Sequence, residues 1–398
     1  MLEFQLYIRM SNNTSRTVLE IPMLDLSRQY ASIRQEVLDA VGRVCDSQKY
    51  ILGEEVTVFE REFAALSGTQ EAVGCASGTD ALWLGLLAAG VRQGDSVVTT
   101  PFSFFATASS IVRAGARPVF ADVDPETLNL DPAKVEACLR SGGSRRSAVM
   151  PVHLYGQCAD MNAFTRVSAE FDLPIVEDAA QAVGATWNGK LAGSWGAASA
   201  FSFYPTKNLS AFGDAGALTT NSSRIAEHAR SLRNHGGKQR YYHDEIGANS
   251  RLDSIQAAVL RVKMPHLASW NDARRQRAIL YEQLLNGAGL TRTGANSAAP
   301  VILLKTRKEA EHIFHQFVIR VQQRDKLRDF LKERGVSTEI YYPVPLHLQK
   351  CFAYLGYAPG DLPEAEQAAR DVLALPIFPE LEEYEQKHVV ESIAEFYS

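Results

Sequence analysis

The sequence predicts an α/β protein in two parts: a large domain built on a mainly parallel, mixed sheet flanked by helices, and a smaller C-terminal α/β domain. Short apolar or β-branched stretches alternate with helical patterns through the first half of the chain. A long helical pattern then leads into a second set of strands and helices. We expect a flexible N-terminal extension at 1–20, the large domain at 21–265, and the connector helix with the small domain at 266–398.

The composition is that of an ordinary globular protein, with 46% hydrophobic and 22% charged residues in a chain of 398. A net charge of −5 gives no indication of a nucleic-acid partner or an anionic membrane surface. The five cysteines are scattered without a CxxC pair, and their number is odd. This favours reduced thiols in a cytoplasmic protein over disulfides or a zinc site.

The N-terminal stretch MLEFQLYIRM carries Glu3 and Arg9 and lacks a continuous apolar core. We therefore expect neither a signal peptide nor a membrane span there. The sequence leaves open whether translation begins at Met1 or at Met10.

Small residues mark the turn from the first predicted strand to the helix after it. The strand begins at Ala72 and stops at Ser77-Gly78-Thr79, and a helix rich in Ala and Leu follows at 80–89. Such a turn leaves backbone N–H groups free at the positive end of the helix dipole, which suits a phosphate. Capping of the helix by Ser77 or Thr79 is the alternative.

The other elements of the first half are recognised by the same periodicities. They are helices at 26–42 and 56–66, strands at 96–100, 118–123 and 148–153, and a helix capped at Asp131. In a mainly parallel sheet, ligands gather beyond the carboxyl ends of the strands.

Asp178 stands at such an end. In FDLPIVED (171–178), Ile175 and Val176 belong to a buried strand, and Glu177 and Asp178 close it. A carboxylate at that place is usually paired or bound to a ligand, because burying it alone is costly. A helix cap or a solvent-facing acid is the alternative.

Lys207 is the candidate nucleophile. The run at 197–204 predicts a buried strand, Pro205 turns the chain out of regular pairing, and Lys207 follows at once. A lysine on a stiff turn at a strand end, away from solvating charges, is expected to have a lowered pKa and a nucleophilic amine. A surface lysine in a turn is the alternative that this stretch leaves open.

Two further motifs are rejected, and no GxGxxG fingerprint of a nicotinamide enzyme is present. GATWNGK (184–190) is close to the phosphate-loop pattern, but Leu191 stands where a hydroxyl is needed and the flanks predict a hairpin. His312 and His315 have the spacing of a metal pair on a helix, yet they begin an apparent strand, where that spacing puts them on opposite faces. We interpret them as structural and expect no metal site.

The second half of the chain completes the large domain and adds the small one. Its expected elements are a strand at 217–219, a helix at 224–232, a polar loop, a helix at 254–264 closed by Pro265, the long helix from 268 to about 285, a strand at 314–321, a helix at 325–334, a strand at 336–342, and two helices that flank ALPIFPEL (374–381).

Six sequence blocks, in a fixed order from Pro22 onward, together carry a resemblance to a known family. They are ASGTDAL (76–82), PVHLYGQCADM (151–161), VEDAAQAVGA (176–185), SFYPTKNLSAFGDAGAL (202–218), NSRLDSIQAAVL (249–260) and YYPVPLHLQ (341–349). The chain resembles the DegT/StrS-type sugar aminotransferases, which are pyridoxal 5'-phosphate (PLP) enzymes of the aspartate-aminotransferase fold. The resemblance covers nearly the whole chain.

The resemblance implies roles at the two ends of the cofactor ring. Lys207 matches the lysine that forms a Schiff base with the cofactor aldehyde, and Asp178 matches the acid that pairs with the pyridinium nitrogen. Gln181 matches a residue near the phenolic oxygen. Phe104 falls where the family stacks an aromatic on the ring face, and apolar core is its alternative.

The resemblance also implies a phosphate site and an obligate homodimer. Gly78 and Thr79 match the phosphate cradle, to which Ser202 adds a hydroxyl. Asn249 matches an asparagine that reaches the phosphate from the neighbouring subunit.

The implied reaction is the transfer of an amino group from L-glutamate to a UDP- or dTDP-linked keto hexose, with C3 favoured, by ping-pong kinetics. Many members have His-Tyr-Pro where this chain has Tyr341-Tyr342-Pro343, so the identity of the sugar stays open. Tyr242, His243, Tyr342 and His347 are candidate sugar contacts, with solvent-facing or packing roles as alternatives.

Two other functions are weighed against the aminotransferase. The family contains PLP-dependent dehydratases in which histidine replaces the lysine, and Lys207 argues against that branch. A regulatory relative that has lost catalysis is the second alternative, and the presence of both Lys207 and Asp178 argues against it.

Overall fold

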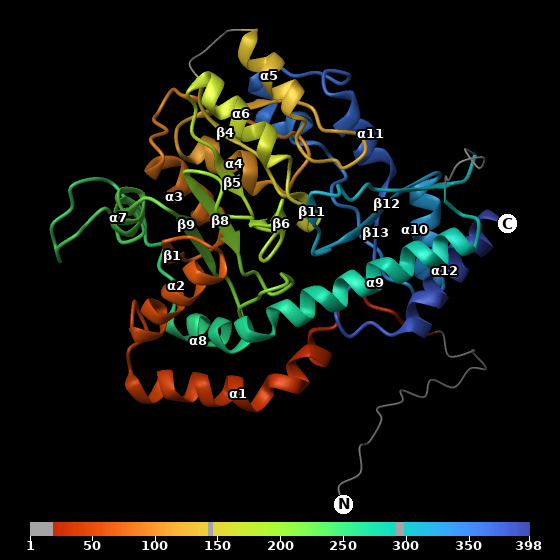
Figure 1. Ribbon diagram of the computed structural model, residues 1–398, viewed down its shortest axis with the longest axis horizontal. Coiled ribbons are helices and arrows are strands. Elements are labelled where there is room, and N and C mark those ends of the chain that lie inside the picture. Colours follow the sequence, from red (N-terminus) through yellow and green to blue (C-terminus); the bar gives the residue numbers. More distant parts are fainter. Residues whose placement is uncertain (1–18, 142–145, 292–297) are drawn as a thin grey trace, which may run out of the picture.

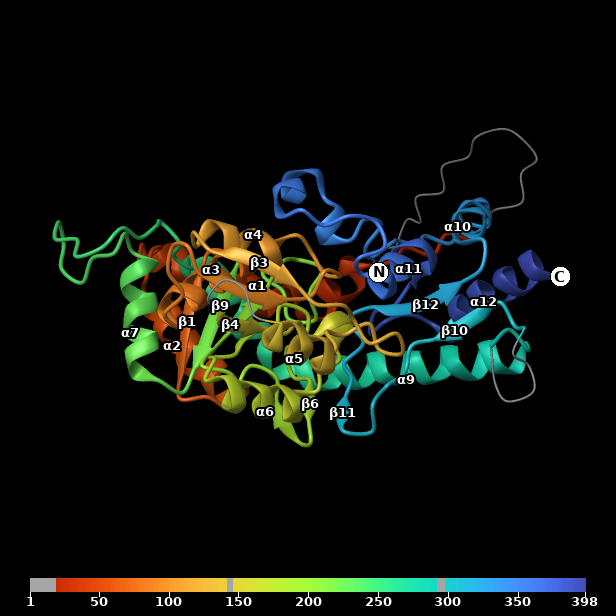
Figure 2. The ribbon, with the colours of Figure 1, turned by 90° about the horizontal axis from the view of Figure 1, so that it is seen from above.

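The structure, a computed structural model, describes residues 19–141, 146–291 and 298–398. The expected extension at 1–20 and the choice between Met1 and Met10 fall almost entirely outside these residues. A larger body of sheet and helices and a smaller body that ends at the C-terminus are joined by the long helix α9 (Leu267–Gly287) (Figure 1). The view from above shows the same two bodies along the longest axis (Figure 2).

The large domain is built on one mixed sheet. Its strands, in spatial order, are β1 (Glu71–Cys75), β9 (Gly216–Thr220), β8 (Ala198–Ser202), β5 (Val176–Asp178), β4 (Arg146–Met150), β2 (Ser96–Thr99) and β3 (Arg117–Phe120). β5 pairs with β8, and β2 with β3 and β4, all in parallel, and parallel bridges such as Val149–Ile175 connect β4 to β5. β9 runs antiparallel to β1 and β8. The predicted mainly parallel, mixed sheet is confirmed.

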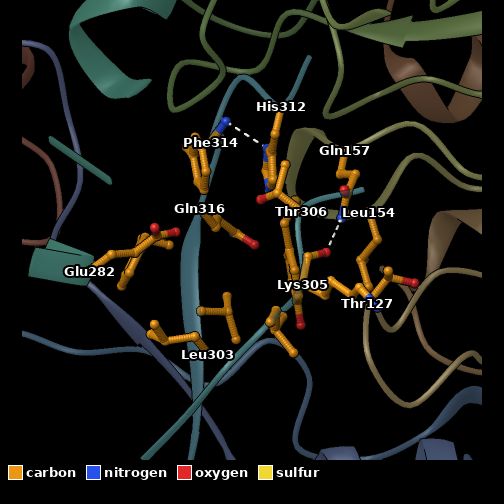
Figure 3. A pocket seen from close by; sticks show the side chains of 14 residues that line it. Thr127, Leu154, Gln157, Glu282, Leu303, Lys305, Thr306, His312, Phe314 and Gln316 are labelled. Atoms are coloured by element: carbon orange, nitrogen blue, oxygen red, sulfur yellow. Dashed lines mark hydrogen bonds between the residues drawn. The ribbon is translucent and has the colours of Figure 1, made fainter. Parts of the chain in front are cut away.

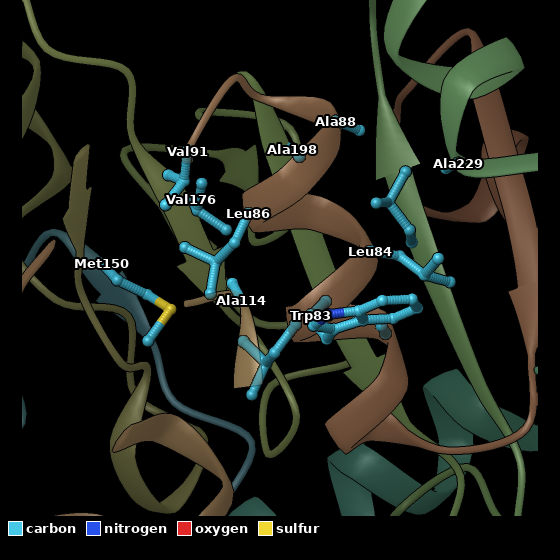
Figure 4. Packing of buried hydrophobic residues seen from close by; sticks show 14 of the residues in the cluster. Trp83, Leu84, Leu86, Ala88, Val91, Ala114, Met150, Val176, Ala198 and Ala229 are labelled. Carbon is cyan, nitrogen blue, oxygen red and sulfur yellow. The ribbon is translucent and has the colours of Figure 1, made fainter. Parts of the chain in front are cut away.

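Helix α3 (Gly78–Ala88) lies within a large apolar cluster. Its side chains Trp83, Leu84 and Leu86 are buried together with strand residues and with helix α7 (Ser223–Leu232) (Figure 4). Full burial of one leucine contributes about 1.5–3 kcal/mol. Packing therefore fixes this helix on several sides, and with it the helix N-terminus at which the sequence predicts a phosphate site.

Four of the remaining helices of the large domain follow the predicted positions, and two, at 106–113 and 161–171, carry no prediction from the sequence. These helices are α1 (Leu26–Ser47), α2 (Glu54–Leu66), α4 (Ala106–Arg113), α5 (Pro132–Arg140), α6 (Met161–Phe171) and α8 (Ser254–Lys263). α1 runs past the predicted end at Gly42 and ends at Ser47, where the left-handed backbone of Gln48 (φ 55°) caps it. Pro265 lies in a short 3₁₀ turn (Met264–His266) between α8 and α9, so it closes α8 as predicted.

The small domain is an antiparallel three-stranded sheet covered by helices. Its strands are β10 (Val301–Leu303), β12 (Phe317–Val321) and β13 (Val372–Leu375), and its helices are α10 (Arg324–Glu333), α11 (Pro363–Asp371) and α12 (Glu383–Tyr397). The predicted strand at 336–342 is wrong. Val336 and Glu339 form only isolated bridges, to Ile21 and Ala374, so that segment is extended without a ladder.

The segment that resembled a phosphate loop is a hairpin of β6 (Thr186–Trp187) and β7 (Lys190–Leu191), to which β11 (Ala310–Glu311) adds a third strand. The hairpin that the flanking residues predict is confirmed. Within the described ranges, none of the helices has both the length and the apolar character needed to cross a membrane.

Candidate active site

A cavity of about 550 Å³ lies beyond the carboxyl ends of β5 and β8, where a parallel sheet is expected to bind its ligands. Residues that the sequence singles out line it: Gly78, Thr79, Phe104, Asp178, Gln181, Ser202, Lys207 and Tyr342. The fold therefore brings the predicted amine, acid and helix N-terminus to one cavity, although they are far apart in the sequence.

Lys207 lies on a turn that follows β8. The Lys207 N–H donates to the Tyr204 carbonyl (2.8 Å), and the Phe203 N–H donates to the Ala215 carbonyl (2.8 Å), which holds the turn against β9. Burial lowers the pKa of the Lys207 ammonium to about 8, although the charge of Asp178 acts in the opposite direction. The amine is therefore much easier to deprotonate than that of an exposed lysine, as predicted.

Asp178 is the last residue of β5 and is buried, with 4% of its surface exposed. Its Oδ2 accepts a hydrogen bond from the Thr107 hydroxyl (2.7 Å), and its Oδ1 accepts one from the Ala180 N–H (3.2 Å). Burial raises the pKa of this carboxyl, while these two donors act to lower it. A cationic donor in the cavity would stabilise the ionised form further.

Glu177, the preceding residue, points to the other side of the strand. Its fully buried carboxylate accepts hydrogen bonds from five donors: His153 Nε2 (2.9 Å), Ser199 Oγ (2.6 Å), and the N–H groups of Gly193 (2.9 Å), Trp195 (2.8 Å) and Gly196 (2.8 Å). Burial raises the pKa of this carboxyl, but the hydrogen bond and charge of His153 and the other donors outweigh burial, so its pKa is lowered. Glu177 is thus satisfied without a ligand.

The start of α3 is arranged to bind an anion. The Ser77 Oγ accepts from the Asp80 N–H (3.1 Å), so the serine caps the helix, while the amides of Gly78 and Thr79 have no intrahelical acceptor. A Cβ added at Gly78 would lie 2.6 Å from the Cβ of Ser202. Glycine is therefore required for the helix to approach β8, and it brings the Ser202 hydroxyl beside the two amides. Capping and anion binding are compatible here.

Gln181 and Tyr342 form one wall of the cavity. The Gln181 Nε2 donates to the Tyr342 Oη (2.9 Å), and its Oε1 accepts from the Tyr155 N–H (2.6 Å). Phe104 lies 6.4 Å from the Tyr342 ring, between centroids, and 57% of its surface is exposed. An apolar-core role for Phe104 is thereby excluded.

Four of the predicted residues lie outside the lining of this cavity. His347 is buried, with its Nε2 hydrogen-bonded to Glu366 (3.2 Å), so it has the packing role that the sequence left as an alternative. Tyr242 and His243 are exposed in the loop at 236–247, which extends away from the molecule in both ribbon views (Figures 1 and 2). Asn249 is exposed at the base of that loop.

Among the lining residues without a prediction as site residues, Thr107 and His315 interact with Asp178 and Lys207, respectively. Thr107 bonds to Asp178 across 71 positions of sequence, and no local pattern marks such a partner. His315 was interpreted as structural, yet it lines the cavity as well. Its position just before β12, where the chain enters the small-domain sheet, was the available signal.

A second cavity of about 20 Å³ lies behind Gln316, which lines both cavities (Figure 3). The labelled side chains of Glu282, Leu303 and Thr306 are among those around it. A space of this size holds about one water molecule. It is therefore too small for a substrate.

An amine of lowered pKa and a buried acid that face one cavity beside a helix N-terminus define an α/β enzyme suited to covalent amine chemistry. Residues 31–394 match the DegT/DnrJ/EryC1/StrS aminotransferase family, and the chain belongs to that family. The predicted family, fold and aminotransferase class are confirmed.

The similar proteins include both enzymes and a protein named for regulation. A "pleiotropic regulatory protein" of Geobacillus stearothermophilus is 50% identical over 95% of this chain and 99% of its own. The UDP-N-acetyl-3-dehydro-α-D-glucosamine 3-aminotransferase of Acidithiobacillus ferrooxidans is 42% identical over 94% and 96%. The crystal structure of S. venezuelae DesV in complex with a ketimine intermediate has a TM-score of 0.89 at 42% identity, covering 95% of this chain and 98% of that one.

Proposed function

We propose that this protein is a PLP-dependent aminotransferase that transfers the amino group of L-glutamate to C3 of a keto hexose linked to UDP or dTDP. The observation that carries the proposal is that Lys207 and Asp178 face one cavity beside the N-terminus of α3. The substrate class is supported by the Acidithiobacillus ferrooxidans relative, which is named for a UDP-linked 3-keto sugar.

The chemistry of the lining residues fits PLP at three points. The free amides of Gly78 and Thr79 and the Ser202 hydroxyl would hold the phosphate. Asp178, buried and without a salt bridge among the described residues, would pair with the protonated ring nitrogen. Lys207 supplies the amine for the aldehyde, with Gln181 and Phe104 along the ring. When bound, PLP supplies an electron sink for the carbon that loses a proton.

The chain's own residues would then carry the proton movements. Asp178 would hold a proton at the ring nitrogen, which favours withdrawal of electrons from the substrate carbon. The amine of Lys207, with a pKa of about 8, would take a proton from the donor carbon in the first half-reaction and deliver one to the acceptor carbon in the second. Since one amine serves both half-reactions, ping-pong kinetics are expected.

We further propose an obligate homodimer in which Asn249 reaches the partner's phosphate site and the loop at 236–247 brings Tyr242 and His243 to the partner's sugar. Exposure of 80% at Tyr241 and 94% at Ile246 supports this, because apolar side chains so exposed are typical of an interface. The five cysteines are all free, which supports a reducing, cytoplasmic location.

The test is a panel of UDP- and dTDP-linked keto sugars incubated with the protein, PLP and L-glutamate, with products identified by mass spectrometry. An aminated sugar with the amine at C3 is expected. A deoxygenated keto sugar without nitrogen would instead make the protein a dehydratase. The name of the Geobacillus relative favours a regulatory protein as second candidate. That candidate predicts bound PLP that glutamate leaves unchanged.

A further inference from the structure

His315 is the member of the rejected histidine pair that lines the active-site cavity, together with Lys207 and Asp178. It is buried, with 8% of its surface exposed, just before β12. His312 instead stacks on Phe314, with ring centroids 3.9 Å apart, and is not among the residues that line this cavity. The two histidines therefore differ in their surroundings: His315 lines the active-site cavity, and His312 does not.

The side chain of Asn208 fixes which ring nitrogen of His315 carries the hydrogen. Asn208 Nδ2 donates to Asn271 Oδ1 (2.8 Å) and to the Ile313 carbonyl (3.2 Å), so its Oδ1 is the atom that faces His315 Nδ1 at 3.2 Å. Asn271 is oriented in turn because its Nδ2 donates to the Val183 carbonyl (3.1 Å). An amide oxygen only accepts hydrogen bonds, so Nδ1 of His315 is the protonated nitrogen.

The surroundings keep the His315 ring neutral. Burial, followed by the positive charges of Lys207 and Arg274 and the presence of His312, lowers the pKa of His315 well below its usual value. Arg274 also donates to the His315 carbonyl (3.2 Å). The neighbouring groups that act on the ring are thus all basic, and the carboxylates that line the cavity are those of Asp178 and Asp214. With its hydrogen on Nδ1, the neutral ring has a free lone pair on Nε2.

We propose that His315 is a positioning residue whose unprotonated Nε2 accepts a hydrogen bond from the ε-amino group of Lys207 when the amine turns toward it with substrate in the cavity. In the structure the two side chains share the cavity without that bond. The bond directs the amine toward the substrate carbon instead of leaving it to rotate in the cavity. Asn208 directly follows Lys207, so one turn of chain both presents the amine and orients its acceptor. This inference rests on the proposed role of Lys207.

The first test is ¹⁵N NMR of the histidine rings in the full protein, with and without PLP. His315 is expected as the neutral Nδ1–H tautomer across the neutral pH range, with Nε2 at the chemical shift of an unprotonated nitrogen. An Nε2–H tautomer or an imidazolium at neutral pH overturns the proposal. The result does not depend on turnover, so it is separate from a failure of the proposed function, which unchanged turnover in Lys207→Ala would reveal.

The second test compares His315→Gln, which keeps an oxygen acceptor, with His315→Leu, which has none. We expect His315→Leu to lower kcat by roughly 10²-fold with KM for both substrates nearly unchanged, and His315→Gln to recover a large part of that loss. Equal losses in the two variants, or a loss confined to KM, overturn the proposal. If either variant fails to fold, the NMR result on the unmodified protein decides.

Asn208→Asp provides a readout that a merely structural histidine would not move. A carboxylate against Nδ1 stabilises the imidazolium, which cannot accept a hydrogen bond at Nε2. The acid limb of the kcat–pH profile should therefore move to higher pH by about one unit. His312→Gln, at the other buried histidine, is the matched control and should leave the profile in place. A profile for Asn208→Asp that superimposes on that of the unmodified protein counts against the proposal.

Discussion

Glu177 and Asp178 are adjacent carboxylates on one buried strand, and their surroundings differ in one decisive respect. Glu177 accepts hydrogen bonds from five donors, whereas Asp178 accepts two and faces a cavity. Burial raises the pKa of both carboxyls, but only at Glu177 do the donors reverse the effect. A buried carboxylate whose hydrogen-bonding capacity is filled by the protein stabilises the fold. One with unused hydrogen-bonding capacity that faces a cavity can bind a ligand.

Two buried lysines repeat the contrast. Burial lowers the pKa of both Lys207 and Lys263 to about 8. Lys263 Nζ donates to the Ser210 hydroxyl (2.9 Å) and lies 4.9 Å from the centroid of the Phe212 ring, while Lys207 faces the cavity. A lowered pKa therefore does not identify a reactive lysine; what the amine faces does.

The largest expected effect separates the two lysines. Lys207→Ala should abolish the visible absorbance of bound PLP and lower kcat by roughly 10⁴-fold, since the amine both holds the cofactor and moves the proton. Lys263→Met should keep the absorbance and most of the turnover. Absorbance spectra and the mass-spectrometric assay check both. Turnover that survives Lys207→Ala would remove the lysine from the mechanism.

The next effect tests the ligand-facing acid. Asp178→Asn keeps the size of the side chain but loses its charge, so the ring nitrogen is no longer held protonated, and kcat should fall by roughly 10²–10³-fold. Stability should change less than in Glu177→Gln, because Thr107 can still donate to the amide oxygen and only the Ala180 N–H loses its acceptor. Stopped-flow measurement of the glutamate half-reaction and urea unfolding check the two parts. A normal rate would show that Asp178 does not act on the cofactor.

The matched substitution at Glu177, whose carboxylate already accepts five hydrogen bonds, should lower the stability of the fold instead of the turnover. Glu177→Gln places an amide N–H₂ against groups that are themselves donors and should cost about 2–3 kcal/mol in the free energy of unfolding. Turnover per molecule with bound PLP should stay close to that of the unmodified protein. Urea unfolding of the PLP-free proteins measures the difference. Should Glu177→Gln and Asp178→Asn unfold alike, the contrast drawn between the two carboxylates would be wrong.

The smallest effect is a pH dependence at Lys207. Only the neutral amine attacks the aldehyde, so the rate at which PLP attaches to the PLP-free protein should rise with pH and level off above about 8. Below that value the rate should fall by roughly tenfold per pH unit, as the protonated form takes over. Stopped-flow absorbance measures it. A midpoint near 10.5, the ordinary value for lysine, would mean that burial does not act on this amine.

The sequence predicted the structure correctly where the local residue pattern and the order of the strands determine it. The run of small and aromatic residues before Pro205 and the apolar run before Asp178 predicted the two strand ends, and the parallel sheet then brought Lys207 and Asp178 to the same edge. The helix at 80–89 was likewise predicted, with Ser77 as its cap.

The sequence was insufficient where tertiary contacts decide. The segment at 336–342 has strand composition but lacks a continuous neighbouring strand, so only Val336 and Glu339 form bridges. Thr107 is recognisable only once α4 lies against β5. The structural role predicted for His315 depends only on its spacing from His312. The groups that surround it, Asn208 and Arg274 of α9, are distant from that segment in the sequence.

Helix α9 has a mechanical consequence for the active site. Leu267, at its start, belongs to an apolar cluster of the large domain, and Tyr281, two-thirds along, belongs to that of the small domain. Between them, Arg274 donates to the carbonyls of Phe314, His315 and Ile377. These bonds tie the middle of α9 to the segment that brings His315 to the cavity, so any movement that separates this segment from α9 must break the bonds of this arginine.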